Sequence, residues 1–198
     1  SEIINGEKDW SKSHPEQYDA ISCGSDQIWN IFITNVRFDR AYFADIPGFL
    51  GKKISYAASI GETDLDKNRK EIKSLLSDFS FIAMREQVDK KKLNSILDKE
   101  ITVVPDPTLL LTKEQYDILK QDINVPDHYV LIYAFGKEKI LTQTLEYIEK
   151  LTNMPVISIS PYKIINGIKH TWDRNAGPGE FLFYVSNADY IITNSFHC

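Results

Sequence analysis

Cysteine is scarce in this chain: only Cys23 and Cys198 occur among its 198 residues. Without a C-x-x-C pair, neither a zinc motif nor a disulfide framework is indicated, and free thiols in a reducing compartment fit better. No apolar run approaches the roughly 18 residues of a membrane span, and no signal-peptide pattern opens the chain. We therefore expect a cytoplasmic protein with no membrane span. Because the first residue is Ser1 and not methionine, we expect an interior fragment of it.

An excess of positive charge is also lacking. The chain has 28 acidic and 23 basic residues, for a net charge of -5. This balance argues against nucleic acid or an anionic membrane as the main partner. Neither G-x-G-x-x-G, nor a P-loop, nor G-x-S-x-G occurs, and no cluster has metal-ligand spacing. Classical nucleotide-binding and serine-hydrolase sites have no local support, and no metal is expected.

What the chain does have is a regular alternation of short β-branched or aromatic runs with longer amphipathic ones. This alternation predicts βαβ units and mainly parallel sheets. The strand candidates are residues 18–23, 53–57, 79–84, 101–104, 129–135, 155–160 and 189–193. Apolar side chains at helical spacing predict three helices. The first helix is marked by Ile72, Leu75, Leu76 and Phe79. The second lies within 138–152 and is marked by Leu141, Leu145, Ile148 and Leu151. The third follows Gly177-Pro178-Gly179 and is marked by Phe181, Leu182 and Val185.

A break between two domains is predicted at Pro105-Asp106-Pro107-Thr108, because two prolines around an aspartate continue neither a strand nor a helix. We expect an α/β domain over residues 1–110, missing its start, and a second over 111–198, missing its end. Residues 160–177 lack periodicity and are expected to form a long connection that borders a site.

Two candidate sites follow strands of the first domain. Gly24 would let the backbone approach a ligand, and Ser25 and Asp26 can cap a helix or bind a hydroxyl. On spacing alone, a tight turn with Trp29 in the core is favoured. Arg85 ends another strand, where it could clamp a carboxylate or phosphate, or simply pair with the neighbouring Glu86.

His197 follows the strand candidate at 189–193. Ligands gather at the carboxyl ends of parallel strands, often against helix N-termini, and a histidine there can hold a phosphate or transfer a proton. The alternative is a histidine that caps a buried helix start. Because the other histidines do not end strands, the functional interpretation is slightly favoured.

Taken together, these segments resemble the polysaccharide pyruvyl transferase family, in matching order over nearly the whole chain. The resemblance lies in Tyr18-Asp19-Ala20, Gly24-Ser25-Asp26-Gln27-Ile28-Trp29-Asn30, Ile54-Ser55-Tyr56-Ala57-Ala58-Ser59, Arg85-Glu86, Asp106-Pro107-Thr108-Leu109-Leu110, Gly177-Pro178-Gly179-Glu180-Phe181-Leu182, Asn187-Ala188-Asp189 and Thr193-Asn194-Ser195-Phe196-His197.

The resemblance implies transfer of pyruvate from phosphoenolpyruvate to a sugar of a cell-surface polysaccharide, or of its lipid-linked precursor, as a ketal. It implies a GT-B-like fold of two Rossmann-like domains, with the site in the cleft between them. The donor is a substrate, and no cofactor is implied. Arg85 and His197 match the family's catalytic positions. Substrate-binding residues are expected at Gly24, Ser25, Asp26, Gln27, Asn194 and Ser195.

The chain departs from the resemblance at Ser195, where members of the cell-wall type have arginine. One anion contact is then absent or comes from another residue, such as Lys169 or Arg174. Two alternatives stay open at this point. A GT-B glycosyltransferase would need a nucleotide-sugar pocket in the second domain, at the ends of strands 129–135 and 155–160. A non-catalytic carbohydrate-binding protein would bind glycan without releasing phosphate.

Overall fold

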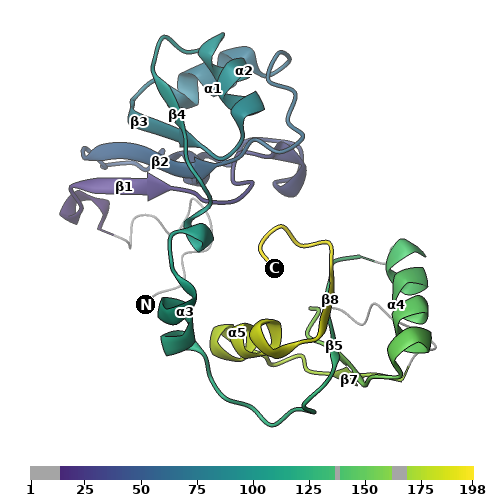
Figure 1. The fold of residues 1–198 in the computed structure, drawn as a ribbon. Coiled ribbons are helices and arrows are strands. Elements are labelled where there is room, and N and C mark those ends of the chain that lie inside the picture. Colours follow the sequence, from purple (N-terminus) through teal and green to yellow (C-terminus); the bar gives the residue numbers. More distant parts are fainter. Residues whose placement is uncertain (1–13, 137–138, 162–168) are drawn as a thin grey trace. The chain divides into compact units, whose positions relative to one another are not determined.

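The computed structural model describes residues 14–136, 139–161 and 169–198. The chain separates into two compact units, Ser1–Leu110 and Leu111–Cys198 (Figure 1). Each unit is built on a four-stranded sheet in which all neighbouring strands are parallel. The predicted α/β class with mainly parallel sheets is therefore confirmed.

The sheet of the first unit follows the chain, in the order β1-β2-β3-β4. Its strands are β1 (Ala20–Cys23), β2 (Lys52–Ala58), β3 (Phe79–Met84) and β4 (Ile101–Val103), and its α-helices are α1 (Arg69–Leu76) and α2 (Gln87–Asn94). Short 3-10 helices lie at Pro15–Gln17 (η2), Ile31–Ile33 (η3), Arg40–Phe43 (η4) and Pro107–Leu109 (η5). Because all four strands run in one direction, the loops that follow them gather at one edge of the sheet.

The core of the first unit is rich in aromatic side chains. Trp29 is buried and stacks on Phe43, with ring centroids 5.3 Å apart, as expected for a core tryptophan. Its indole N–H donates to the Tyr42 carbonyl, so the polar edge of the ring is satisfied. Phe79, which the helical spacing groups with α1, instead begins β3 and meets Trp29 edge-on. The helix ends at Leu76, because the chain must turn before it enters the strand.

The sheet of the second unit has the order β7-β6-β5-β8. Its elements are α3 (Lys113–Leu119), β5 (Val130–Tyr133), α4 (Lys139–Thr152), β6 (Val156–Ser158), β7 (Thr171–Trp172), α5 (Pro178–Asn187) and β8 (Tyr190–Thr193). The chain leaves β5 toward β6 on one side and returns to place β8 on the other. The carboxyl ends of β5 and β8 therefore form a topological switch point, where open α/β sheets bind ligands.

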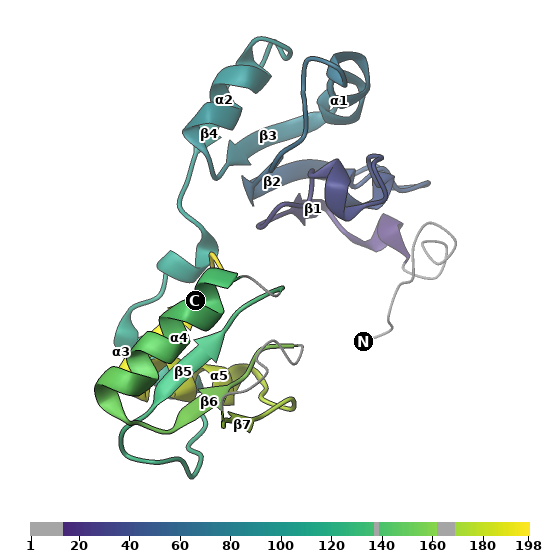
Figure 2. The same cartoon turned by 90° about the vertical axis from the view of Figure 1, so that its right-hand side faces the viewer.

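Helices cover both faces of this second sheet. Figures 1 and 2 show α4 on one face of β5 and α5 on the other. Alternate residues of β5 explain this arrangement: Val130 and Ile132 pack with Leu145 of α4, whereas Leu131 packs with Tyr184 of α5. Successive side chains of a strand point to opposite faces, so a wholly apolar strand can be covered on both.

Several elements differ from the sequence prediction. The helical spacing predicts Leu151 on the inner face of α4, but this residue is 63% exposed and lies one position before the helix ends. Glu138, the predicted start of that helix, lies outside the described residues. The supposed connection 160–177 contains β7, although residues 162–168 also lie outside the described part of the chain. The helices α2 and α3 are not predicted by the apolar spacing of the sequence. In the described ranges, no helix combines the length and apolarity needed to cross a bilayer.

Candidate active site

Backbone hydrogen bonds lock together the loops at the carboxyl edge of the first sheet. The Arg85 N–H donates to the Ala58 carbonyl at 2.9 Å, which ties the loop after β3 to the end of β2. The Ser59 N–H donates to the Asp26 carbonyl at 3.0 Å, which ties β2 to the loop after β1. The Val104 N–H donates to the Met84 carbonyl at 3.0 Å and adds β4. The side chains of these loops are thus held at fixed positions.

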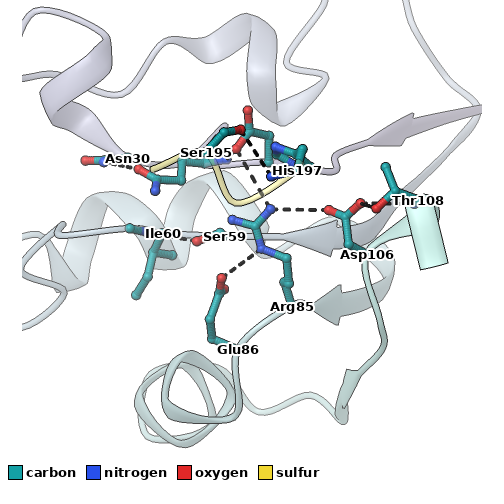
Figure 3. Close-up of polar contacts among 12 residues, drawn as sticks. Asn30, Ser59, Ile60, Arg85, Glu86, Asp106, Thr108, Ser195 and His197 are labelled. Carbon is teal, nitrogen blue, oxygen red and sulfur yellow. Dashed lines mark hydrogen bonds and ion pairs between the residues drawn. The ribbon is translucent and has the colours of Figure 1, made fainter. Parts of the chain in front are cut away.

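Arg85 lies at the centre of this edge and is surrounded by carboxylates (Figure 3). Its Nε donates to Oε1 of Glu86 at 2.8 Å, and its Nη1 donates to Oδ2 of Asp106 at 3.3 Å. Oδ1 of Asp26 lies 3.9 Å from the same Nη1. The arginine side chain is only 7% exposed, so these are interactions of a largely desolvated charge.

The carboxylates keep Arg85 charged. Burial by itself lowers the pKa of the guanidinium, but the hydrogen bond and charge of Glu86, followed by Asp106 and Asp26, raise the pKa above its usual value. The simple Arg85–Glu86 ion pair considered from the sequence is therefore present. An anion clamp at Arg85 stays a prediction. A substrate that bound the bonded donors would have to displace Glu86 or Asp106.

Asp106 is a further member of the charged network around Arg85 and is not among the site residues predicted from the sequence. Its side chain is 1% exposed. Oδ1 accepts from the Thr108 N–H at 3.0 Å and from the Thr108 hydroxyl at 2.8 Å, which leaves Oδ2 for Arg85. The signal for it is present in the sequence, because an aspartate before Pro107 after a strand is a typical N-cap. It caps η5, at the predicted break between domains.

The segment Gly24–Gln27 forms the loop after β1. Asp26 faces Arg85, and Ser25 is half-buried beside it. No helix begins at Ser25 or Asp26, in contrast to the capping role considered from the sequence. The cap is Asn30, whose side chain accepts from the Phe32 N–H at the start of η3 and donates to Gln27 Oε1 at 2.7 Å. Gln27 therefore fixes the loop, and substrate binding by this segment stays a prediction.

Gly24 has no room for a side chain. Its φ is +118°, and a Cβ would collide with the Tyr56 carbonyl oxygen. We expect Gly24→Ala to lower the free energy of unfolding by about 2–4 kcal/mol, through strain at this φ and the backbone collision. Gly48→Ala is the matched control, because φ is +85° there but no atom lies within 4 Å of the added Cβ. It should cost about 1–2 kcal/mol. Chemical denaturation measures both, and equal costs would contradict the collision.

His197 follows β8 at the switch point of the second sheet. It is exposed, and its backbone N–H donates to the Ser195 hydroxyl at 3.3 Å (Figure 3). The neighbouring Phe196 ring meets the imidazole edge-on, with centroids 5.2 Å apart. The residues 196–197 form a turn, and the described chain shows no helix there. This turn decides neither the functional interpretation of His197 nor the alternative in which it caps a helix start.

The two residues before Phe196 hold this turn. Asn194 pairs with Phe135 after β5, since its Oδ1 accepts from the Phe135 N–H and its Nδ2 donates to the Phe135 carbonyl, both at 2.8 Å. The Ser195 N–H donates to Thr193 Oγ1 at 2.9 Å, and the Ser195 hydroxyl accepts from His197. Asn194 and Ser195 thus position the histidine, and their contact with substrate stays a prediction.

The alternative cation at Arg174 stacks on the Trp172 ring, with the guanidinium carbon 5.0 Å from the ring centroid, and Lys169 is exposed. Within residues 14–136, 139–161 and 169–198, no three His, Cys, Asp or Glu residues are grouped as metal ligands. Burial raises the pKa of the Cys23 thiol to about 11, so it is a poor nucleophile at neutral pH.

Comparison with protein families gives one match. The family model described as polysaccharide pyruvyl transferase matches residues 2–198, which is nearly the whole chain. Searches of curated proteins and of solved structures found no match.

Proposed function

This chain belongs to the polysaccharide pyruvyl transferase family, and we propose that it transfers pyruvate from phosphoenolpyruvate to two hydroxyls of one sugar, forming a ketal. The match over residues 2–198 carries the reaction class and implies a carbohydrate acceptor. The donor, the ketal product and a polysaccharide or its lipid-linked precursor as acceptor are parts of the proposal.

In the proposed reaction, the two protons lost by the sugar hydroxyls equal the protons gained by the methylene carbon and by phosphate. The methylene carbon of phosphoenolpyruvate gains one proton and becomes the methyl group of the ketal. Two sugar hydroxyls each lose a proton as they form bonds to the adjacent carbon, and the C–O bond to phosphate breaks. One of the two hydroxyl protons therefore replaces the one given to the methylene, and the other leaves with phosphate. The site needs groups that move protons and groups that bind phosphate and carboxylate.

The two strand-end positions supply candidates for these roles. We assign His197 to proton transfer or phosphate binding, since it is exposed after β8 at the switch point of its sheet. We assign Arg85 to the carboxylate or phosphate of the donor, since it is the buried cation at the carboxyl edge of the first sheet. That both residues act on one substrate, in a GT-B organisation, stays a prediction.

A phosphate-release assay tests the proposal. The complete protein, given phosphoenolpyruvate and a panel of acceptor glycans, should release phosphate only when a suitable acceptor is present. Mass spectrometry should then find a glycan that has gained one pyruvate ketal. The control arms replace phosphoenolpyruvate with UDP- or GDP-sugars. Nucleotide release in those arms, without phosphate release from phosphoenolpyruvate, would instead support the glycosyltransferase alternative, which the family match does not favour.

A further inference from the structure

Next to Arg85, the start of α2 carries two carboxyl groups, those of Glu86 and Asp89. Glu86 immediately precedes α2, and Asp89 is in the first turn of that helix. Three positions apart at the start of one helix, the two side chains lie on the same side of it, and a hydrogen bond to Glu86 contributes to the raised pKa of Asp89. Asp89 is 3% exposed and its Oδ2 accepts from the Ile60 N–H at 3.3 Å. A buried acidic side chain on the apolar side of a helix is unusual unless it has a specific partner.

One carboxylate oxygen of Glu86 is hydrogen-bonded and the other is not. Its Oε1 accepts from Arg85 Nε at 2.8 Å. Its Oε2 is buried and has no hydrogen-bond partner among the described residues. Two ionised carboxylates are acceptors only, so neither can satisfy the other. One proton between them changes this, because Asp89 would then donate to Oε2 of Glu86 in a charge-assisted hydrogen bond.

The surrounding charges also favour one proton on the pair. Around Glu86 and Asp89 lie two cations and, on the far side of the guanidinium, two carboxylates. These are Arg85 on Glu86, Lys92 on α2, and Asp26 and Asp106 on Arg85. Burial, and then the charge and hydrogen bond of Glu86, raise the pKa of Asp89 to about 6, although the Ile60 N–H and Lys92 oppose this shift.

We propose that Glu86 and Asp89 share one proton and that this proton positions the Arg85 guanidinium. With the proton present, Oε2 of Glu86 is held by Asp89 and Oε1 is aimed at Arg85 Nε. When the proton is lost, the two adjacent negative charges repel each other, and Glu86 Oε2 no longer receives a hydrogen bond from Asp89. Glu86 and Asp89 are therefore positioning residues. Their effect on turnover rests on the proposed function, whereas the shared proton does not.

Asp89→Asn mimics the protonated pair. The amide that this substitution introduces can donate to Glu86 Oε2, and its oxygen can still accept from the Ile60 N–H. Asp89→Ala removes both contacts, and Asp98→Asn is the control because it neutralises an exposed carboxylate beyond the same helix. In wild type, the pKa of Asp89 is higher in the folded state than in the unfolded state, so protonation of Asp89 stabilises the fold at low pH. This stabilisation is lost as the pH rises through the pKa of the folded state. Relative to wild type, the folding constant of Asp89→Asn should rise by up to about 10²-fold between about pH 4 and pH 7. Asp98→Asn should show no such trend.

Carboxyl-carbon NMR of the wild-type protein supplies a test that needs no variant to fold and no substrate. The Asp89 carboxyl signal should titrate with an apparent midpoint near 6. A midpoint for Asp89 at or below its ordinary value would overturn the proposal. So would Asp89→Asn and Asp89→Ala having the same pH profile of stability.

Activity adds a third readout. If the protein releases phosphate, Asp89→Asn should flatten the loss of kcat/KM that wild type shows as pH rises through the titration of the pair, and Asp89→Ala should not. If every variant lacks phosphate release while the Asp89 carboxyl titrates near 6, the proposed function fails and the shared proton stands. If phosphate release is normal and the Asp89 carboxyl titrates at its ordinary value, the shared proton fails alone.

Discussion

Replacing Arg85 with alanine should lower the free energy of unfolding by about 3–5 kcal/mol, the range for removing one partner of a buried ion pair. The side chain of Asp106 is 1% exposed, and its Oδ2 would lose the guanidinium that neutralises it. Glu86 and Asp26 would lose the same cation. Urea denaturation at neutral pH measures the change. A loss below about 1 kcal/mol, typical of a surface pair, would show that the network does not stabilise the fold.

A double-mutant cycle separates the pair from the other contacts of Arg85. Asp106→Asn keeps the hydrogen bond to Thr108 through its amide oxygen and removes the charge. If the buried pair dominates, the double variant Arg85→Ala/Asp106→Asn should cost less than the sum of Arg85→Ala and Asp106→Asn, because no unpaired carboxylate remains at position 106. If the losses in the free energy of unfolding are additive, Arg85 stabilises the fold mainly through its contacts with Glu86 and Asp26.

Arg85→Ala also tests whether Arg85 binds the anionic donor. If Arg85 binds phosphoenolpyruvate directly, its loss should weaken donor binding by about 2–3 kcal/mol, the worth of hydrogen bonds to a charged group in a desolvated site. Arg85→Lys keeps the charge but loses the planar fork, and measures how much of the effect is bidentate geometry. Donor affinity that follows only the folded fraction of each variant would make Arg85 a structural residue that aligns the loops.

The sequence indicated the sheets well, because long apolar strands packed on both faces leave a clear pattern. The strand at Val130–Tyr133 is one example. Two of the elements that escaped prediction, α3 and β7, bury little or nothing. The helix α3 has no buried residue, and its only signal is the capping box of Thr112 and Gln115. The strand β7 consists of Thr171 and Trp172 alone, too short for any alternation to be read.

The site was harder to predict, since its decisive contacts join residues distant in the chain. Arg85 and Asp106 are brought together only by the pairing of β3 with β4. The sequence identified Arg85 from its place after a strand, yet could not show that carboxylates surround it. Asp89 was detectable in principle, because it shares the helical spacing i, i+4, i+7 with the buried Leu93 and Ile96. A charged residue on an apolar face is a signal of a buried polar network.

His197→Ala should lower turnover of the complete protein by about 10²-fold or more if the imidazole transfers a proton. The change should leave folding intact, because the side chain is exposed and the turn is held by backbone and side-chain bonds of Asn194 and Ser195. His128→Ala is the matched control. His128 is also exposed, pairs with Asp189 at 3.1 Å, and precedes β5 at the opposite end of the same sheet. Its replacement should not affect turnover.

His197→Gln distinguishes the two roles proposed for the histidine. Glutamine can donate a hydrogen bond to phosphate, but it cannot exchange a proton near neutral pH. If His197 is an acid or base, the alanine and glutamine variants should lose turnover equally, with little change in the KM for phosphoenolpyruvate. If His197 only binds phosphate, alanine should raise that KM and glutamine should restore much of the affinity. Steady-state phosphate release decides between them, and normal kinetics in both variants would show that the reaction does not run through this residue.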